Sequence, residues 1–172
     1  CLVLHSWTGS PQEVRGLGEH LAAQGHTVLG PRLTHHGTTP GDMNRSRWRD
    51  WYFCALDGWY VLKAQCEEVT AVGLSMGGTL ALGLASQQPL SAVATLSTPI
   101  DIPADWRLRF AEMLAFLHPF YPKSEQTASW ADEGAAALRV AYSVWPARAV
   151  REARDGLREM RDILPRINVP VL

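Results

Sequence analysis

The chain has 172 residues, 47% of them hydrophobic, which fits one folded domain and argues against disorder. Sixteen basic and seventeen acidic residues leave a formal net charge of -1, so no overall field favours nucleic acid or an anionic membrane as a partner. The three cysteines have no ligand spacing, which indicates neither a disulfide framework nor a zinc site and favours a reducing, cytoplasmic location. No apolar run reaches the roughly 18 residues of a membrane span, so stable membrane insertion is not expected.

Strand signals alternate with helix signals in the first hundred residues. Short apolar runs of the kind that form buried parallel strands occupy residues 1–5, 26–30, 68–74 and 91–96. Helical patterns between them occupy residues 10–24, 46–65 and 76–88, and the segment 31–44 is expected to be a loop. This alternation predicts an α/β fold whose parallel sheet is covered by helices on both faces and joined by right-handed crossovers.

Two of these helices carry more specific signals. Ser10 and Glu13 have the spacing of a capping box around Pro11, and Gly25 marks the end of the first helix. The second helix has an apolar face that recurs every three or four residues, formed by Trp48, Trp51, Tyr52, Ala55, Trp59 and Leu62. We therefore expect side-chain capping in the first helix and burial of this face in the second.

After residue 100 the alternation stops. Residues 101–165 give no strand signal, and their apolar residues form three helical faces, which predicts an all-helical insertion. The faces comprise Trp106, Phe110, Met113, Leu114 and Leu117; Leu138, Tyr142 and Trp145; and Val150, Ala153, Leu157, Met160 and Leu164. The final segment INVPVL, residues 167–172, is expected to return to the sheet as a strand. The sequence thus predicts a core at residues 1–100, a helical lid at 101–165 and the start of a returning core strand at 166–172.

One serine stands at a junction between a strand and a helix. In GLSMG, residues 73–77, Ser75 is flanked by Gly73 and Gly77, which fits the G-x-S-x-G pattern of a nucleophile elbow in the context that the pattern requires. A sharp strand-to-helix turn forces the serine into strained backbone angles and crowds both glycine positions. Such a turn would hold Oγ at the carboxyl end of the sheet, and the helix that starts near Met76 would offer a free N–H to an oxyanion.

Other interpretations of this stretch are a glycine-rich turn with an incidental serine and a phosphate-binding turn. A dinucleotide fingerprint fails because Ser75 occupies the central glycine position of G-x-G-x-x-G, and a P-loop fails because no Gly-Lys-Ser/Thr follows. The nucleophile interpretation is therefore favoured. It implies no cofactor and no metal.

Four segments in order resemble the α/β-hydrolase family, especially its bacterial carboxylesterase and monoacylglycerol-lipase branch. They are HSWTG (5–9), THHGTTP (34–40), WRDW (48–51) and GLSMGG (73–78), and the similarity covers residues 2–100. The resemblance implies that Ser75 is the nucleophile, and that the backbone N–H groups of Trp7 and Met76 form the oxyanion hole and bind the substrate. Ser6 stands where the family usually has glycine, so this loop must accommodate a Cβ.

In this family the triad follows the order serine, acid, histidine, with the acid after the strand that follows the lid and the histidine after the final strand. The resemblance therefore implies that both partners of Ser75 lie beyond Leu172, that the 172 residues alone are an inactive part of a hydrolase, and that the strand at 91–97 has an unpaired edge. The alternative is a triad of Ser75, His118 and a lid carboxylate, which is disfavoured because a base on the helical insertion would be poorly positioned.

The remaining candidates have simpler explanations. His5 and His36 match motif positions that shape loops, so structural roles are favoured over proton transfer, and His20 and His26 are expected at the surface or in packing. The run RSRWRDW (45–51) mixes arginine with tryptophan as nucleic-acid-binding segments do, but arginines at a helix start in a neutral chain usually belong to a solvated face.

The leading hypothesis is a serine esterase or lipase that cleaves small-molecule carboxylic esters of short to medium acyl chains through an acyl-enzyme on Ser75. A non-catalytic or catalytically incomplete protein of the same fold is one alternative. Thioesterase, amidase or acyltransferase chemistry is another, because the pocket rather than the fold selects the acyl substrate.

Overall fold

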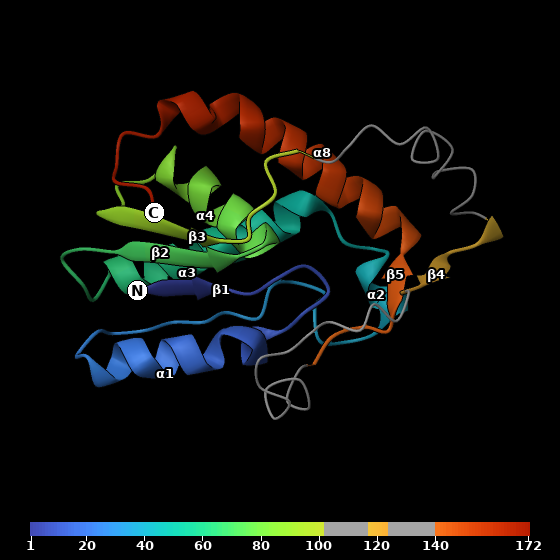
Figure 1. Ribbon diagram of the computed structural model, residues 1–172, viewed down its shortest axis with the longest axis horizontal. Coiled ribbons are helices and arrows are strands. Elements are labelled where there is room, and N and C mark those ends of the chain that lie inside the picture. The colour runs from blue at the N-terminus through green and yellow to red at the C-terminus, as the bar shows by residue number, and fades with distance from the viewer. Residues whose placement is uncertain (102–116, 124–139) are drawn as a thin grey trace.

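The computed structural model describes residues 1–101, 117–123 and 140–172. Its helices are α1 (Arg15–Ala23), α2 (Pro40–Met43), α3 (Trp48–Lys63), α4 (Met76–Ala85) and α8 (Ala147–Ile163), with short 3₁₀ helices at Pro11–Val14 and Leu164–Arg166. Its strands are β1 (Leu2–Leu4), β2 (Thr70–Leu74), β3 (Ala92–Leu96), β4 (Phe120–Pro122) and β5 (Val144–Pro146). Figure 1 shows the sheet of β1, β2 and β3 with helices packed around it, as an α/β protein requires.

The strands of this sheet run parallel in the order β1-β2-β3. Leu4 at the end of β1 pairs with Gly73 near the end of β2, so the carboxyl ends of the two strands lie side by side. The strand expected at residues 26–30 is reduced to a bridge between Leu29 and Leu2. Its ladder stops because the next donor would belong to Pro31, which has no backbone N–H.

The last residues of the chain extend the sheet beyond β3. Val171 bridges Val93 in parallel, and the Leu172 N–H donates to the Val93 oxygen at 3.0 Å. The Thr95 N–H in turn donates to the Leu172 oxygen at 2.8 Å. A parallel bridge therefore stands where the sequence predicts the sheet to resume. The expectation that the strand at 91–97 has an unpaired edge is wrong, because residues 170–172 occupy that edge.

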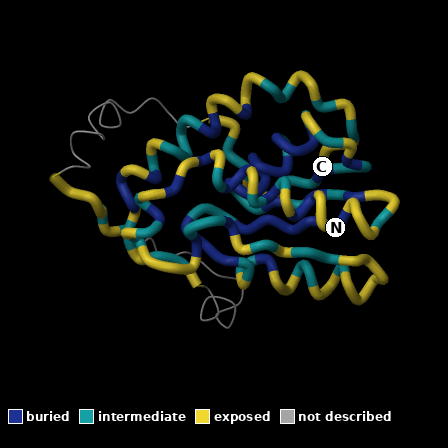
Figure 2. Tube along the Cα trace, turned by 180° about the vertical axis from the view of Figure 1, so that it is seen from behind, coloured by how far each residue is buried: buried dark blue, intermediate teal, exposed yellow. Residues whose placement is uncertain are grey.

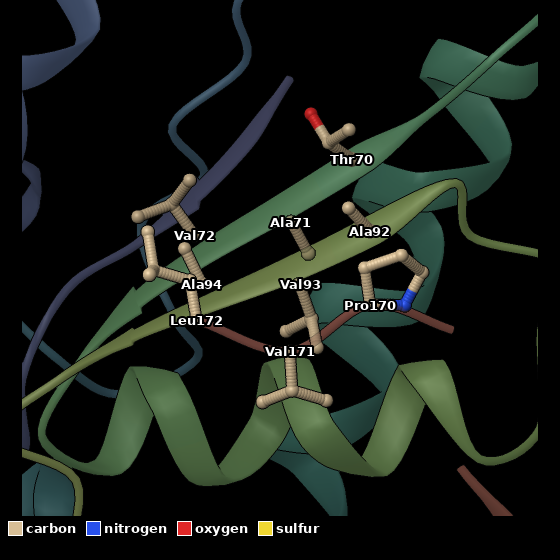
Figure 3. Close-up of a pocket in the computed structure, with 9 residues that line it drawn as sticks. All are labelled: Thr70, Ala71, Val72, Ala92, Val93, Ala94, Pro170, Val171 and Leu172. Atoms are coloured by element: carbon tan, nitrogen blue, oxygen red, sulfur yellow. The ribbon is translucent and has the colours of Figure 1, made fainter. Parts of the chain in front are cut away.

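The core lies between the sheet and helices α3 and α4, and α8 packs against α3 and α4 (Figure 2). The side chains of β2 alternate between buried and half-buried, because one face of the strand packs on α4. The other face of the sheet, which includes Val72 of β2 and its partner Ala94 of β3, is only partly covered, and a groove of about 270 Å³ lies along β2, β3 and residues 170–172 (Figure 3). The expectation that helices cover both faces of the sheet is therefore only partly met by the described residues.

The helices of the first half lie close to their expected ranges. All six residues of the apolar face expected in the second helix are buried on α3. Helix α2 was not expected; its start is capped by Thr39, whose Oγ1 accepts from the Asp42 N–H at 3.1 Å. The prediction of a capping box at Ser10 is wrong. The Ser10 hydroxyl makes no capping bond, and the Glu13 carboxylate binds Ser6 instead.

The insertion contains strands as well as a helix. β4 and β5 form an antiparallel pair in which Tyr121 lies opposite Trp145. The helical face expected from Tyr142 and Trp145 is therefore wrong, and the physical reason is Pro146, which favours extended backbone in the residue before it. The third expected face is confirmed on α8, where Leu157 and Met160 are buried. Most of the first expected face, and Leu138 of the second, lie outside the described residues, so the three-region division stays a prediction.

Candidate active site

Ser75 occupies the sharp turn between β2 and α4. Its backbone has φ 53° and ψ −118°, in a region that non-glycine residues rarely enter. The Ser75 N–H donates to the Leu96 oxygen at 2.8 Å, and its own carbonyl accepts from the Gly78 N–H at 2.9 Å. These bonds tie the strained turn to β3 on one side and to the first turn of α4 on the other.

The glycines around Ser75 are required by close backbone approaches. A Cβ on Gly73 would collide with the carbonyl group of Gly77, and a Cβ on Gly78 would collide with the Thr98 side chain. A Cβ on Gly77 would lie 2.7 Å from the His5 carbonyl oxygen. The sequence-based explanation of Gly73 and Gly77 is therefore confirmed: both positions exclude any side chain.

The turn leaves the Ser75 hydroxyl half-buried, and within the described part of the chain it makes no hydrogen bond. Met76 is the first residue of α4, so its N–H has no acceptor inside the helix and lies at the positive end of the helix dipole. The strained serine and a free helical N–H therefore stand next to each other at the carboxyl end of β2.

The loop that follows β1 lies beside this turn. The pairing of Leu4 with Gly73, and the approach of Gly77 to His5, bring residues 5–8 next to the start of α4. Within the loop the Gly9 N–H donates to the Ser6 oxygen at 3.2 Å, and Thr8 adopts φ 62°. The structure thus brings together the two segments that carry Trp7 and Met76, as the sequence predicted.

Ser6, the departure from the family pattern, has a partner. Its hydroxyl donates to Oε2 of Glu13, and its backbone N–H donates to the same oxygen at 3.2 Å. Gly9 packs against that carboxylate so closely that a Cβ on it would collide with Glu13. The extra side chain at position 6 is therefore accommodated by anchoring the loop to the 3₁₀ helix at Pro11–Val14.

Two buried histidines, His5 and His36, contact each other where this loop meets the segment that follows residue 31. His5 is fully buried, and its Nδ1–H donates to the Ser6 oxygen at 2.9 Å while Nε2 accepts from the Leu33 N–H at 3.1 Å. Burial lowers the pKa of His5. Burial, together with the proximity of His5, lowers the pKa of His36 to about 3. Both rings are neutral at pH 7 and link loops, which supports the structural roles expected for them.

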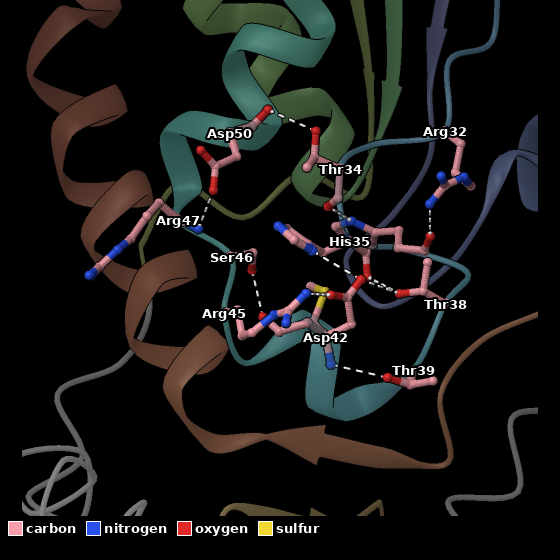
Figure 4. Close-up of polar contacts among 12 residues, drawn as sticks. Arg32, Thr34, His35, Thr38, Thr39, Asp42, Arg45, Ser46, Arg47 and Asp50 are labelled. Atoms are coloured by element: carbon pink, nitrogen blue, oxygen red, sulfur yellow. Dashed lines mark hydrogen bonds and ion pairs between the residues drawn. The ribbon is translucent and has the colours of Figure 1, made fainter.

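A polar cluster orders the loop between residues 31 and 47 (Figure 4). His35 Nδ1 lies 3.0 Å from an Asp42 carboxylate oxygen, which also accepts from the Thr38 hydroxyl at 2.9 Å. The hydrogen bonds from His35 and Thr38, with a further one from Arg45, lower the pKa of Asp42 to about 2. The THHG sequence did not predict this pairing, although TTPGD carried the capping signal of α2.

Within the described part of the chain, none of the other candidate residues hydrogen-bonds to Ser75. His20, His26 and His118 are exposed. Each arginine of the run at 45–51 forms an ion pair, with Asp42, Glu152 or Glu159, as a solvated face does. No group of three metal-binding side chains, and no helix long and apolar enough to cross a membrane, occurs among the residues that the structure describes. The acid and histidine expected beyond Leu172 stay a prediction.

Sequence reasoning missed three residues that contact the loop after β1: Lys123, Tyr142 and Trp145. They come from the β4–β5 hairpin and its flanks, far along the chain from residues 7 and 8. No local pattern predicts such a contact, because periodicity reports only which face of an element is apolar.

A parallel sheet that carries a strained serine at a glycine-lined strand-to-helix turn defines a class of α/β proteins, the hydrolase-like folds. Residues 2–129 match the family whose description is alpha/beta hydrolase fold, and the chain belongs to that family.

Curated relatives and solved structures agree with this assignment. The chain is 41% identical over 104 residues to a thermostable monoacylglycerol lipase of Bacillus sp. (strain H-257), a match that covers 60% of this chain and 42% of the relative. It is 32% identical over 105 residues to a carboxylesterase of Bacillus subtilis (strain 168), covering 60% of this chain and 43% of that one. The chain thus spans less than half the length of the curated relatives it matches.

Among solved structures, one from work on the metagenome-derived lipolytic enzymes LipS and LipT superposes with a TM-score of 0.86 at 30% identity, covering 99% of this chain and 68% of that chain. A monoacylglycerol lipase of Paleococcus ferrophilus gives a TM-score of 0.74 at 17% identity, covering 99% of this chain and 70% of that chain, and so shows the shared fold alone.

Proposed function

We propose that the protein is a serine hydrolase that cleaves carboxylic esters. Ser75 attacks the ester carbonyl, the backbone N–H groups of Trp7 and Met76 stabilise the tetrahedral oxyanion, and water releases the acyl group from Ser75. The observation that carries this proposal is the backbone of Ser75, held at φ 53° between two glycines that admit no Cβ. Strain of this kind is retained where it serves a site, because a relaxed turn would be more stable.

The proposed substrates are small esters with short to medium acyl chains. Two named relatives, a monoacylglycerol lipase and a carboxylesterase, support this substrate class. A series of p-nitrophenyl esters tests it: we expect alkyl acyl groups to be turned over faster than charged ones, and a preference for a charged acyl group would contradict the proposal. A cytoplasmic location is part of the proposal, and the three free cysteines are consistent with a reducing compartment.

The nucleophile is tested by covalent labelling. In the complete protein, with the acid and histidine expected beyond Leu172, a fluorophosphonate should attach to Ser75, and Ser75→Ala should abolish both labelling and ester turnover. Ser97→Ala is the matched control, because Ser97 also has a positive φ, 50°, at the end of the neighbouring strand β3 but no helix begins in residues 98–101. Labelling that persists in Ser75→Ala would overturn the assignment.

The alternative is a protein of the same fold that has no enzymatic activity. It predicts that neither the unchanged protein nor any variant reacts with the fluorophosphonate. Thioesterase, amidase or acyltransferase chemistry predicts labelling of Ser75 together with poor turnover of p-nitrophenyl esters, so the two experiments separate these possibilities.

A further inference from the structure

The loop after β1 is also contacted by the β4–β5 hairpin and the residues that flank it. The indole rings of Trp7 and Trp145 are stacked, with centroids 5.0 Å apart and planes 9° from parallel. Lys123 Nζ donates to the Thr8 hydroxyl at 2.7 Å, and the Tyr142 N–H donates to the Thr8 carbonyl oxygen at 3.2 Å. Three residues of the hairpin and its flanks therefore converge on two adjacent loop residues.

Thr8 needs such contacts because its backbone is unfavourable. A φ of 62° is rare for a β-branched residue, so the surrounding structure must hold it there. Thr8 is 1% exposed, and the two hydrogen bonds from Lys123 and Tyr142 satisfy its hydroxyl and its carbonyl. Contacts that hold Thr8 therefore restrain the carbonyl side of Trp7, while the Ser6–Trp7 peptide, which carries the Trp7 N–H, is held at the Ser6 oxygen by Gly9 and His5.

Lys123 joins the two contacts into one unit. Its ammonium lies 4.2 Å from the centroid of the Trp145 ring, so it binds the ring face and the Thr8 hydroxyl together. Its backbone N–H donates to the Ser143 oxygen at 3.2 Å, which extends the hairpin ladder by one bond. The backbone of Lys123 is thus held by the hairpin, while its ammonium contacts both the hairpin and the loop.

We propose that Trp145 and Lys123 are positioning residues that hold the loop of Trp7 and Thr8, so that the Trp7 N–H stays directed at the oxyanion. This inference rests on the proposed function of Ser75. The loop then has two anchors: Ser6 is fixed to Glu13 within the core, and Trp7 and Thr8 are fixed to the insertion. The stacked ring of Trp145 and the charge of Lys123 act through the backbone of the loop and touch no reacting atom.

The test compares paired substitutions on a p-nitrophenyl ester. Trp145→Ala removes the stacked ring, and we expect kcat to fall at least about tenfold with KM changed less than about threefold, because a misdirected donor weakens transition-state binding selectively. Trp145→Phe keeps an aromatic ring on Trp7 and should retain most of kcat. Lys123→Met should lower kcat and Lys123→Arg should restore it, whereas Lys63→Met on α3, whose ammonium binds the Glu67 carbonyl, should leave kcat unchanged.

A spectroscopic measurement reports the stack without any activity. Two stacked indoles give an exciton couplet in far-ultraviolet circular dichroism where their transition dipoles are rotated relative to each other within the ring planes, and Trp7→Phe and Trp145→Phe should each remove that couplet, while Trp59→Phe should not. Loss of the couplet in Trp145→Ala with kcat unchanged would overturn the positioning role. A couplet that both Trp7→Phe and Trp145→Phe leave unchanged would overturn the stack itself.

The outcomes also separate this inference from the proposed function. Turnover abolished by Ser75→Ala but unaffected by Trp145→Ala and Lys123→Met overturns only the positioning role. Turnover that survives in Ser75→Ala, or no turnover by the complete protein with the acid and histidine expected beyond Leu172, overturns the proposed function and the positioning role with it. A fall of kcat in Trp145→Ala that Trp145→Phe does not rescue, accompanied by an equal rise of KM, would indicate general loss of structure and also contradict the inference.

Discussion

Gly77, in the first turn of α4, lies against the end of β1, where a Cβ on it would stand 2.7 Å from the carbonyl oxygen of His5. This approach joins the turn that holds Ser75 to the loop that holds Trp7. The neighbouring atoms at this contact are backbone, so they cannot move aside as a flexible side chain would. The relative position of the two proposed oxyanion donors therefore depends on the absence of one methyl group.

Gly77→Ala should destabilise the protein and misplace the donors together. We expect the free energy of unfolding to fall by about 1–3 kcal/mol, as overpacking against rigid neighbours costs, with a loss of ester turnover larger than the loss of folded protein. Urea unfolding and kcat measured on the same samples check this. Gly16→Ala is the control: a Cβ there meets nothing within 4 Å on α1, so the unfolding free energy should rise by about 0.5–1 kcal/mol. Equal behaviour of the two variants would contradict the steric argument.

The sequence predicted the parts of the fold that depend on local patterns. The apolar run before Ser75 and the glycines around it predicted β2, the turn and α4, because each feature is contained within a few consecutive residues. The periodicity of tryptophans predicted the buried face of α3 for the same reason. Where a local signal competed with a contact outside its own pattern, it failed: Glu13 has capping-box spacing, yet its carboxylate binds Ser6, seven residues earlier.

The candidate site was predictable only as far as its motifs reach. GLSMG and HSWTG predicted which segments meet at the carboxyl end of the sheet, and the register of β1 on β2 brings them together. The support of the loop by Trp145 and Lys123 was not predictable, since these residues have no spacing relative to Trp7 that a pattern could report. The helix expected at Tyr142 and Trp145 shows the same limit, because the residues recur with helical spacing although Pro146 favours a strand before it.

The buried histidines predict acid sensitivity. Burial depresses the folded-state pKa of His5, and that of His36 to about 3 from an ordinary value of 6.5. Below pH 6.5 the unfolded chain therefore binds protons that the folded chain excludes, so the stability present at pH 7 is lost as the pH falls from about 6.5 towards 3. The slope is at most about 1.4 kcal/mol per pH unit for each histidine.

Unfolding measured in urea between pH 7 and 5 checks this prediction, because that range lies above the titration of most carboxylates. His36→Asn keeps a donor near the Thr34 oxygen, which the His36 ring binds, and should reduce the slope. His26→Asn, at an exposed position, should leave it unchanged. A slope in His36→Asn equal to that of the unchanged protein would show that His36 does not contribute.

Helix α8 should stabilise the start of α3 through one carboxylate. Glu152 accepts from the Trp48 N–H at 3.2 Å and pairs with the Arg47 guanidinium at 2.8 Å, and its side chain is only 15% exposed. Glu152→Ala should lower the unfolding free energy by about 1–2 kcal/mol, because a helix N-terminal donor loses its partner. The matched variant Glu159→Ala removes an exposed ion pair with Arg49 and should cost less than about 0.5 kcal/mol. Thermal unfolding of both checks the ranking, and a larger loss in Glu159→Ala would reverse the argument.

His118 offers the last prediction, because it is the only histidine after Ser75 in the 172 residues. Its side chain is exposed, and the carbonyl of the next residue, Pro119, accepts from the Asn44 side chain at 2.9 Å and from the Ala147 N–H at 3.0 Å. These bonds fix the backbone beside His118 to the end of α2 and the start of α8. We therefore expect His118→Ala to keep kcat/KM for a p-nitrophenyl ester within about twofold of the unchanged protein. Loss of a general base costs about 10²–10⁴ in rate, so a fall of that size in His118→Ala, with labelling of Ser75 by a fluorophosphonate equally slowed, would instead make His118 the base of Ser75.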